Sequence, residues 1–342
     1  MIRFECDYAT GAHPKVLQKL VETNLEECPG YGVDDHCAHA AQMLKDLCKA
    51  PNADVHFLVG GTQTNMTVIA AALRPHQGAI SAVSGHINGH ETGAVEATGH
   101  KVLTLPSEDG KITGAQIGAL CKAHFEDPSV EHLVQPGLVY ISHPTEVGTL
   151  YTVKELEAIR EAADRWHLPL FVDGARLVYG LAAGEVTLAD LARLADVFYL
   201  GGTKAGTLMG EAVVITNDAL KPDFRYLIKQ RGGMLAKGRL LGVQYEGLLE
   251  DNLFEEIGKK AVAQALRIRK AFEAKGYPLL FDSPTNQQFP ILPKDKLARL
   301  SEKYTSCYWC DPDEDHSCVR YVTGWSTRDE DVDALIRDIE AL

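Results

Sequence analysis

The sequence predicts an α/β protein with a mostly parallel sheet covered by helices on both faces, followed by a smaller α+β C-terminal domain. Short apolar runs alternate with longer helix-forming stretches through most of the chain, as in repeated β–α units around a parallel sheet. At 342 residues the chain can bury the core of one broad domain and a smaller second one. We expect an N-terminal arm over residues 1–15, a large domain over 16–245 and a small domain over 246–342.

The expected strands and helices begin with a strand that ends in a glycine pair. An apolar run at 57–59 is broken by Gly60-Gly61, and Thr62 stands as the N-cap of the helix that follows through 66–73. Thr152 and Glu155 have the spacing of a capping box, which predicts a helix over 153–166. A long amphipathic segment runs from about Leu241 to Lys275, and short strands and a final helix follow it. The remaining expected strands are 78–83, 101–105, 138–142, 168–172, 197–200 and 212–215, with helices from about 113 and over 188–195.

Two polar residues follow neighbouring apolar strands of this pattern. Asp173 comes directly after the run 168–172, and Lys204 follows the run 197–200 across a glycine pair. Parallel sheets place their sites at the C-terminal ends of strands. A lysine there can form a Schiff base with the aldehyde of pyridoxal phosphate (PLP), and an aspartate can pair with its pyridine nitrogen. Either residue alone is more often a cap or a solvated side chain.

The glycine pair at 60–61 supplies a third element, a site for an anion. Glycines let backbone N–H groups approach a phosphate, Thr62 adds a hydroxyl donor, and a helix N-terminus favours negative charge. The segment has neither the lysine of a Walker loop nor the spacing of a dinucleotide loop. Alone it would be an ordinary strand–turn–helix connection. Together with Asp173 and Lys204, it predicts a PLP site.

These blocks resemble the threonine aldolase and β-eliminating lyase family, PLP enzymes of the aspartate-aminotransferase-like fold (fold type I). The specific match is Asp173-Gly174-Ala175-Arg176 with Lys204, and the resemblance extends from Phe4 to the C-terminal helix. Weaker landmarks are the segments 31–34, 61–62, 86–87 and 320–323. The resemblance implies a sheet of the seven-stranded type and a homodimer or homotetramer with shared active sites.

The resemblance also implies roles for residues around the cofactor. Lys204 and Asp173 would bind PLP, Gly61 and Thr62 would hold its phosphate, and His86 would stack on its ring. Arg176 is expected to contact the cofactor as well as the substrate.

Other roles concern the substrate. Arg176 and Arg320 are expected to clamp its carboxylate, because the arginine fork binds a carboxylate bidentately. Tyr31 is expected to bind substrate too. His143 falls where the family carries a histidine near the substrate hydroxyl, and an imidazole there could take the β-hydroxyl proton at neutral pH.

The chain departs from the family pattern at three places. Cys6-Asp7-Tyr8 stands where Ser-Asp-Thr is usual, which leaves the role of Cys6 open, and Gly60 replaces a serine of the phosphate segment. Leu235 occupies the position of an arginine that reaches a neighbouring subunit's phosphate. The nearby cations Lys237, Arg231 and Arg239 are candidates to replace it, and we expect Lys237 to bind the cofactor.

The expected function is therefore a PLP-dependent carbon–carbon lyase. It would cleave the Cα–Cβ bond of L-threonine, L-allo-threonine or a related L-β-hydroxy-α-amino acid to glycine and an aldehyde. A β-eliminating lyase or an aminotransferase on the same scaffold remains an alternative. A second alternative is a non-catalytic protein that binds a ligand or metal.

The composition of the chain excludes some classes of binding partner. Lys and Arg total 34 against 47 Asp and Glu, a formal charge of −13, which argues against nucleic acid or an anionic membrane as a partner. The first residues lack the apolar region of a signal peptide, and no apolar run has the length of a membrane helix. We expect a cytoplasmic protein.

Two groups of residues contain possible metal ligands. Cys307, Cys310, His316 and Cys318 have some of the spacing of a zinc site, but strand alternation would send the first two to opposite faces. His86, His90 and Glu91 are in the wrong order for a helical metal motif, and Gly89 interrupts the helix. We expect free thiols and no metal at these groups.

Overall fold

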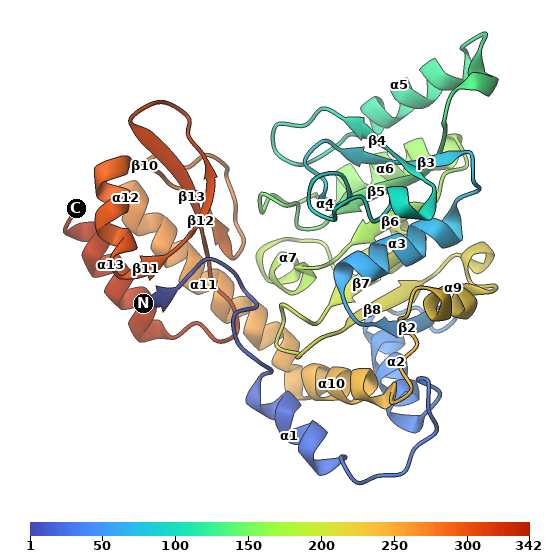
Figure 1. Ribbon diagram of the computed structural model, residues 1–342, viewed down its shortest axis with the longest axis horizontal. Helices are drawn as coiled ribbons and strands as arrows, with labels where there is room; N and C mark the ends of the chain where they lie inside the picture. The colour runs from blue at the N-terminus through green and yellow to red at the C-terminus, as the bar shows by residue number, and fades with distance from the viewer.

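The computed structural model describes residues 1–342, and its centre is a seven-stranded sheet with helices on both faces (Figure 1). The strand order is β2-β8-β7-β6-β5-β3-β4. Only β8 runs against its neighbours, and all other strands are parallel to one another. The strands are β2 (Asp54–Leu58), β3 (Gln77–Ala82), β4 (Lys101–Leu105), β5 (Gln135–Ser142), β6 (Leu170–Asp173), β7 (Val197–Gly201) and β8 (Glu211–Ile215). The predicted fold class is confirmed.

Alternation along the buried strands divides the large domain's core into two layers. In β5, Val139 and Ile141 belong to the cluster on one face, and Leu138 and Tyr140 belong to the cluster on the other. The first face is covered by α2 (Asp35–Leu47), α5 (Gly114–Phe125), α6 (Val153–Arg165), α7 (Leu177–Ala183), α8 (Leu188–Leu194) and α10 (Arg239–Leu249). The second face is covered by α3 (Gly61–Ala72), α4 (His86–Gly89) and α9 (Phe224–Gln230). The capping box of Thr152 and Glu155 is present at the start of α6, as predicted.

One predicted helix boundary was wrong, and the amphipathic segment from Leu241 to Lys275 contains a break. The N-cap of α3 is Gly60, so Thr62 is the second residue of the helix and not its cap. The long segment past Leu241 is two helices, α10 and α11 (Leu253–Ala274). Asp251 and Asn252 separate them with φ of 54° and 58°, in the left-handed region that Asp and Asn tolerate better than most residues.

The small domain packs helices against a short antiparallel sheet. Strand β13 (His316–Val322) pairs with β10 (Ile291–Pro293), β12 (Cys307–Cys310) and β9 (Gln287–Gln288). Phe272 of α11, Tyr321 of β13 and Leu335 of α13 (Asp329–Glu340) share its core, and α12 (Lys294–Ser301) adds Leu300. Helix α11 runs from this domain toward α10 below the large sheet (Figure 1). None of the helices is both long enough and apolar enough to cross a membrane.

The N-terminal segment connects the two domains. Strand β1 (Ile2–Arg3) pairs in parallel with β11 (Tyr304–Thr305) of the small domain. The chain then crosses to the large domain, where α1 (Pro14–Glu22) packs against α10 (Figure 1). The predicted arm over 1–15 therefore lies between the domains, and the boundaries at 15 and 245 remain predictions.

All eight cysteines are free thiols. A bulge in β12 shifts the register, so that Cys307 lies opposite Arg320 and Cys310 opposite Cys318. The His316 ring donates a hydrogen bond to Asp313 and is not grouped with the cysteines.

Candidate active site

A cavity of about 310 Å3 lies at the C-terminal ends of β5, β6 and β7, beside the N-terminus of α3. The three strands end at Ser142, Asp173 and Gly201. Six of the site residues predicted from the sequence line this cavity: Gly61, Thr62, His86, Asp173, Arg176 and Lys204. Tyr8, Asn65, Glu146, Tyr199 and Glu211 line it as well and were not predicted as site residues. The structure thus gathers three sequence motifs, the glycine pair, the aspartate block and the lysine, around one cavity.

The turn after Asp173 requires glycine. A Cβ added to Gly174 would lie 1.8 Å from the backbone oxygen of Tyr199, which no side chain can tolerate. The carbonyl of Gly174 accepts a hydrogen bond from the N–H of Gly201 at 3.0 Å. This close contact joins the ends of β6 and β7, and so fixes the spacing between Asp173 and the segment that carries Lys204.

Asp173 is a buried carboxylate with four hydrogen-bond donors. The hydroxyls of Tyr199 and Tyr140 donate to it at 2.5 and 2.6 Å, and the Asn65 amide and the Ala175 N–H each donate at 2.9 Å. Burial raises the pKa of this carboxyl, but the tyrosine hydrogen bonds outweigh burial, and the pKa lies below its usual value. Asp173 is therefore negatively charged at neutral pH.

Lys204 lies among buried charges. Burial, followed by the charge of Arg176, lowers the pKa of its amine below the ordinary value for lysine. Burial raises the pKa of the adjacent Glu211 carboxyl, which accepts a hydrogen bond from the Thr203 hydroxyl at 2.8 Å. A lowered pKa increases the fraction of neutral amine at neutral pH, and only the neutral amine is a nucleophile.

His86 begins the short helix α4 and is held at two points. Its backbone N–H donates to Glu146 Oε1 at 2.8 Å, and its Nδ1–H donates to Glu91 Oε1 at 2.7 Å. Burial lowers the pKa of the imidazole, but the hydrogen bond to Glu91 and the charge of Asp173 together raise it above its usual value. Because Nδ1 carries the proton toward Glu91, Nε2 is the acceptor atom of the neutral ring.

The two predicted carboxylate-binding arginines differ in their surroundings. Arg176 lines the cavity, but Nε and Nη2 already donate to the buried Asp7 at 2.8 and 3.1 Å. Arg320 comes from β13 of the small domain and is not among the residues that line the cavity. Its Nη1 donates to Gln287 at 3.0 Å, whereas its Nε is buried without an acceptor. Arg320 thus has an unpaired donor, and Arg176 is held in orientation by Asp7.

The structure does not bring His143 to the cavity. The side chain is completely buried, and Nδ1 accepts a weak hydrogen bond from the Tyr151 N–H at 3.4 Å. Burial lowers the pKa of this imidazole to about 4. Its neighbours Ser142 and Pro144 line the cavity and His143 does not, because successive side chains at the end of a strand point to opposite sides.

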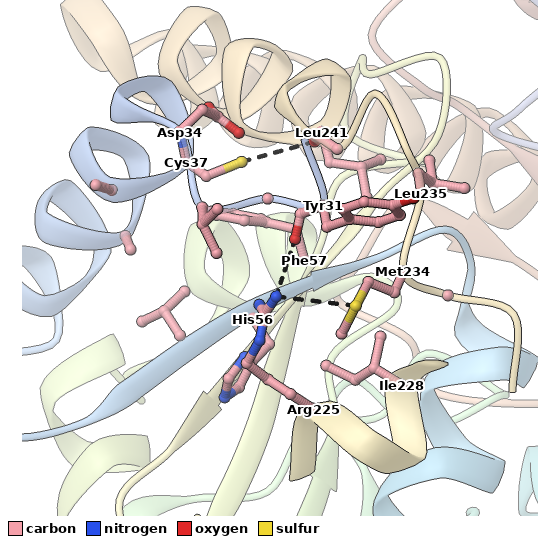
Figure 2. A pocket seen from close by; sticks show the side chains of 17 residues that line it. Tyr31, Asp34, Cys37, His56, Phe57, Arg225, Ile228, Met234, Leu235 and Leu241 are labelled. Carbon is pink, nitrogen blue, oxygen red and sulfur yellow. Dashed lines mark hydrogen bonds between the residues drawn. The ribbon is translucent and has the colours of Figure 1, made fainter. Parts of the chain in front are cut away.

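Tyr31 lines a second cavity, of about 190 Å3, between α2 and the segment that precedes α10 (Figure 2). Its backbone carbonyl accepts a hydrogen bond from Arg225 at 3.1 Å, and its side chain is 48% exposed. Leu235 and Met234 lie on the same cavity wall. Within one chain, therefore, Tyr31 does not share a cavity with Lys204.

The three cations near Leu235 have different environments. Arg239 donates to the carbonyls of Thr23 and Asn24 at 2.8 and 3.0 Å, so it stabilises the end of α1. The carbonyl of Arg231 accepts a hydrogen bond from Gln63 in the first turn of α3. Lys237 is exposed, and its side-chain amine has no hydrogen-bond or ion-pair partner in this chain, whereas its backbone carbonyl accepts from the Leu240 N–H at 3.1 Å.

Comparison with known proteins agrees with this geometry. Residues 4–292 match the family model described as β-eliminating lyase. A Pseudomonas protein named low specificity L-threonine aldolase is 31% identical over 99% of this chain and 97% of its own length. A structure of Leishmania major threonine aldolase superposes with a TM-score of 0.97, at 45% identity over 100% of this chain and 99% of the other. An aspartate aminotransferase of Thermus thermophilus has the same fold, with a TM-score of 0.71 at 12% identity over 99% of this chain and 96% of the other.

Proposed function

Because the chain belongs to the β-eliminating lyase family, we propose that it binds PLP in the cavity around Lys204 and cleaves β-hydroxy-α-amino acids. The chain is an enzyme of the threonine aldolase type. The expected substrates are L-threonine, L-allo-threonine and related L-β-hydroxy-α-amino acids, and the products are glycine and an aldehyde. Full-length similarity to threonine aldolases supports this reaction.

The cavity offers PLP one suitable group for each of its three polar parts, the phosphate, the aldehyde and the ring nitrogen. The first turn of α3 has no side-chain cap at Gly60, so its backbone N–H groups are free to bind a phosphate. Lys204 offers a nucleophilic amine, and Asp173 a buried negative charge, on the same cavity wall. When bound, PLP supplies a conjugated ring that accepts the electron pair left on Cα as the Cα–Cβ bond breaks. Asp173 already accepts four hydrogen bonds, so a ring nitrogen would have to share or replace one of those donors.

The substrate carboxylate is assigned mainly to Arg320. The unpaired Nε shares one edge of the guanidinium fork with Nη2, and Nη1 on the other side is bonded to Gln287. A carboxylate at that edge would satisfy a buried donor that otherwise costs free energy. Arg176 contributes its remaining N–H groups, with its orientation fixed by Asp7.

We infer that Nε2 of His86 is the base that accepts the proton of the substrate β-hydroxyl. This atom belongs to a ring that lines the cavity, and Glu91 holds the opposite nitrogen protonated. His143 was the sequence-based candidate for this step. Its ring is buried outside the cavity and has a lowered pKa, so His86 is the better placed base.

We place Tyr31 and Lys237 in a site shared between two copies of the chain. Tyr31 and Val33 both line the second cavity and are 48% and 62% exposed, so their side chains are accessible to a second copy. Lys237 is an exposed cation between Leu235 and Gly238, which both line that cavity. A homodimer or homotetramer could bring these residues to the Lys204 cavity of a second subunit.

The observation that carries the proposal is the meeting of Lys204, Asp173 and the uncapped start of α3 around one cavity. The test is to add PLP to the purified protein and record its visible spectrum. L-Threonine, L-allo-threonine and L-phenylserine are then supplied in turn. Glycine released with the matching aldehyde is the expected result, and the relative rates rank the substrates.

Other products would favour the alternatives. A keto acid with ammonia, and no glycine, would identify a β-eliminating lyase. Loss of the bound-aldehyde absorbance, restored only when a keto acid is added, would identify an aminotransferase. A protein that never changes the PLP spectrum would contradict the proposal altogether.

A further inference from the structure

A cluster of side chains with different ligand atoms lies at the N-terminal end of α2, and its members line neither of the two cavities. It contains the Glu26 carboxylate, the Cys28 thiol and the His36 imidazole, whose ligand atoms lie within 4.8 Å of one another. Glu26 and Cys28 belong to the segment between α1 and α2, and His36 is in the first turn of α2. The three residues combine O, S and N donors, which is the combination that zinc accepts.

A buried carboxylate orients the imidazole of this cluster. Glu246 of α10 is 4% exposed, and its Oε2 accepts a hydrogen bond from His36 Nδ1 at 2.8 Å. Its second oxygen accepts from His39 Nδ1, also at 2.8 Å. Metal-binding histidines generally donate their other ring N–H to a carboxylate or carbonyl in this way. The nitrogen left to face the cluster is Nε2, which lies 2.7 Å from Glu26 Oε2.

The thiol of the cluster lies beside a fixed positive charge. Arg239 Nη1 is 3.7 Å from Cys28 Sγ, and the same guanidinium is anchored by the carbonyls of Thr23 and Asn24. Arg239 therefore holds the Cys28 side chain beside the end of α1, on the side where Glu26 and His36 lie.

We propose that Glu26, Cys28 and His36 form a zinc site, with Glu246 as the residue that positions His36. Tetrahedral zinc would place the three donor atoms roughly 3.3–3.6 Å apart. Rotations of the Glu26 and Cys28 side chains would reach that geometry from the present one, in which all three ligand atoms lie within 4.8 Å of one another. The fourth position is open toward solvent, because the Glu26 side chain is 49% exposed, and water would occupy it. On binding, zinc replaces the Nε2 proton of His36 and the thiol proton of Cys28, and both protons pass to solvent.

The site would fix the segment that leads to Tyr31. Glu26 and Cys28 come shortly before Tyr31, which has a φ of 65°, while His36 lies on α2 behind it. A metal bonded to both parts would hold this exposed segment against α2 and α10. This role does not depend on the reaction proposed above.

The test uses the full-length protein, first treated with a chelator and dialysed. Zinc alone is added and its content is measured by elemental analysis, with one zinc per chain expected. Cobalt(II) is added to a second sample, where a thiolate ligand gives a strong near-ultraviolet charge-transfer band. The expected result is that Cys28→Ser removes this band, and that Glu26→Gln and Glu246→Gln each weaken zinc binding about 10- to 100-fold.

Matched variants make the outcome decisive. Cys310→Ser removes a partly buried thiol near His316 in the small domain and should leave zinc content unchanged. Glu26→Gln alters an exposed side chain, so its effect does not depend on a folding defect. Wild-type protein that holds no zinc after dialysis would overturn the site. Zinc lost from Cys310→Ser, or retained equally by Cys28→Ser and Glu26→Gln, would overturn it as well.

Discussion

The cavity around Lys204 and the cavity around Tyr31 differ in how their polar groups are satisfied. In the Lys204 cavity, strand ends bring buried charges together, and Asp173, His86 and Glu211 each have hydrogen-bond partners within the chain. The Tyr31 cavity is lined mostly by apolar side chains, from the segments 31–34 and 233–238 and from α2, β2, α9 and α10 (Figure 2). The side-chain amine of Lys237 beside it has no partner in the chain. The first cavity is preorganised within one chain, and the second is suited to be completed by another copy.

The largest expected effect is at the lysine of the first cavity. Lys204→Ala removes the amine that bonds to the cofactor, so kcat should fall by roughly 10³-fold or more. The visible absorbance of the lysine-bound cofactor should disappear, while the circular dichroism spectrum remains that of the wild type. A variant that retains both the absorbance and the activity would exclude Lys204 as the bonding amine.

The next effect concerns binding of the substrate carboxylate. Arg320→Gln removes a charge-assisted hydrogen-bond donor worth about 1.5–3 kcal/mol, so KM should rise about 10- to 100-fold. Steady-state kinetics with L-threonine provide the measurement. Arg299→Gln, on the exposed face of α12, is the matched control and should leave KM unchanged. Equal KM values for the two variants would assign the carboxylate to Arg176 instead.

A pH profile tests the proposed base of the first cavity. The pKa of His86 is raised, mainly by its hydrogen bond to Glu91, so Nε2 is protonated and inactive as a base below that pKa. The value of kcat/KM should therefore rise with pH as His86 loses its proton. In Glu91→Gln the pKa of His86 falls, and the acid limb should move to lower pH. Glu96→Gln, an exposed neighbour, should not move the limb. An acid limb that stays in place in Glu91→Gln would exclude His86.

The smallest expected effect is at the lysine of the second region. Lys237→Ala should weaken PLP binding only about two- to fivefold, because an exposed ion pair contributes about 0.2–1 kcal/mol. The difference between variant and wild type should shrink as salt is raised, since exposed charges are screened. Titration of the apoprotein with PLP at two salt concentrations measures both quantities. A difference that does not depend on salt would argue against a phosphate contact by Lys237.

The parts of the site that could be predicted from the sequence are those with a local signal. Asp173, Lys204 and Gly61 each stand where an apolar run stops, so the strand pattern places them at one edge of the sheet. Tyr140 and Tyr199 were missed because an aromatic residue inside an apolar strand is usually part of the core. Their hydroxyls reach Asp173 only because the two strands lie on either side of β6.

Long-range contacts set the limit of prediction. His143 follows Ser142, which faces the cavity, so alternation turns His143 away; which of the two faces the cavity depends on the pairing of β5 with β6, where Ser142 lies opposite Asp173. No sequence signal could join Glu246 to His36, because these residues are 210 positions apart and meet only when α10 packs on α2. The pairing of Asp7 with Arg176, 169 positions apart, has the same origin.

The most direct test of the account is to follow L-threonine in the presence of the PLP-loaded enzyme by proton nuclear magnetic resonance. Cleavage of the Cα–Cβ bond predicts glycine and acetaldehyde in equal amounts from wild type, and neither product from Lys204→Ala. Formation of 2-oxobutanoate without glycine would contradict the proposed bond cleavage.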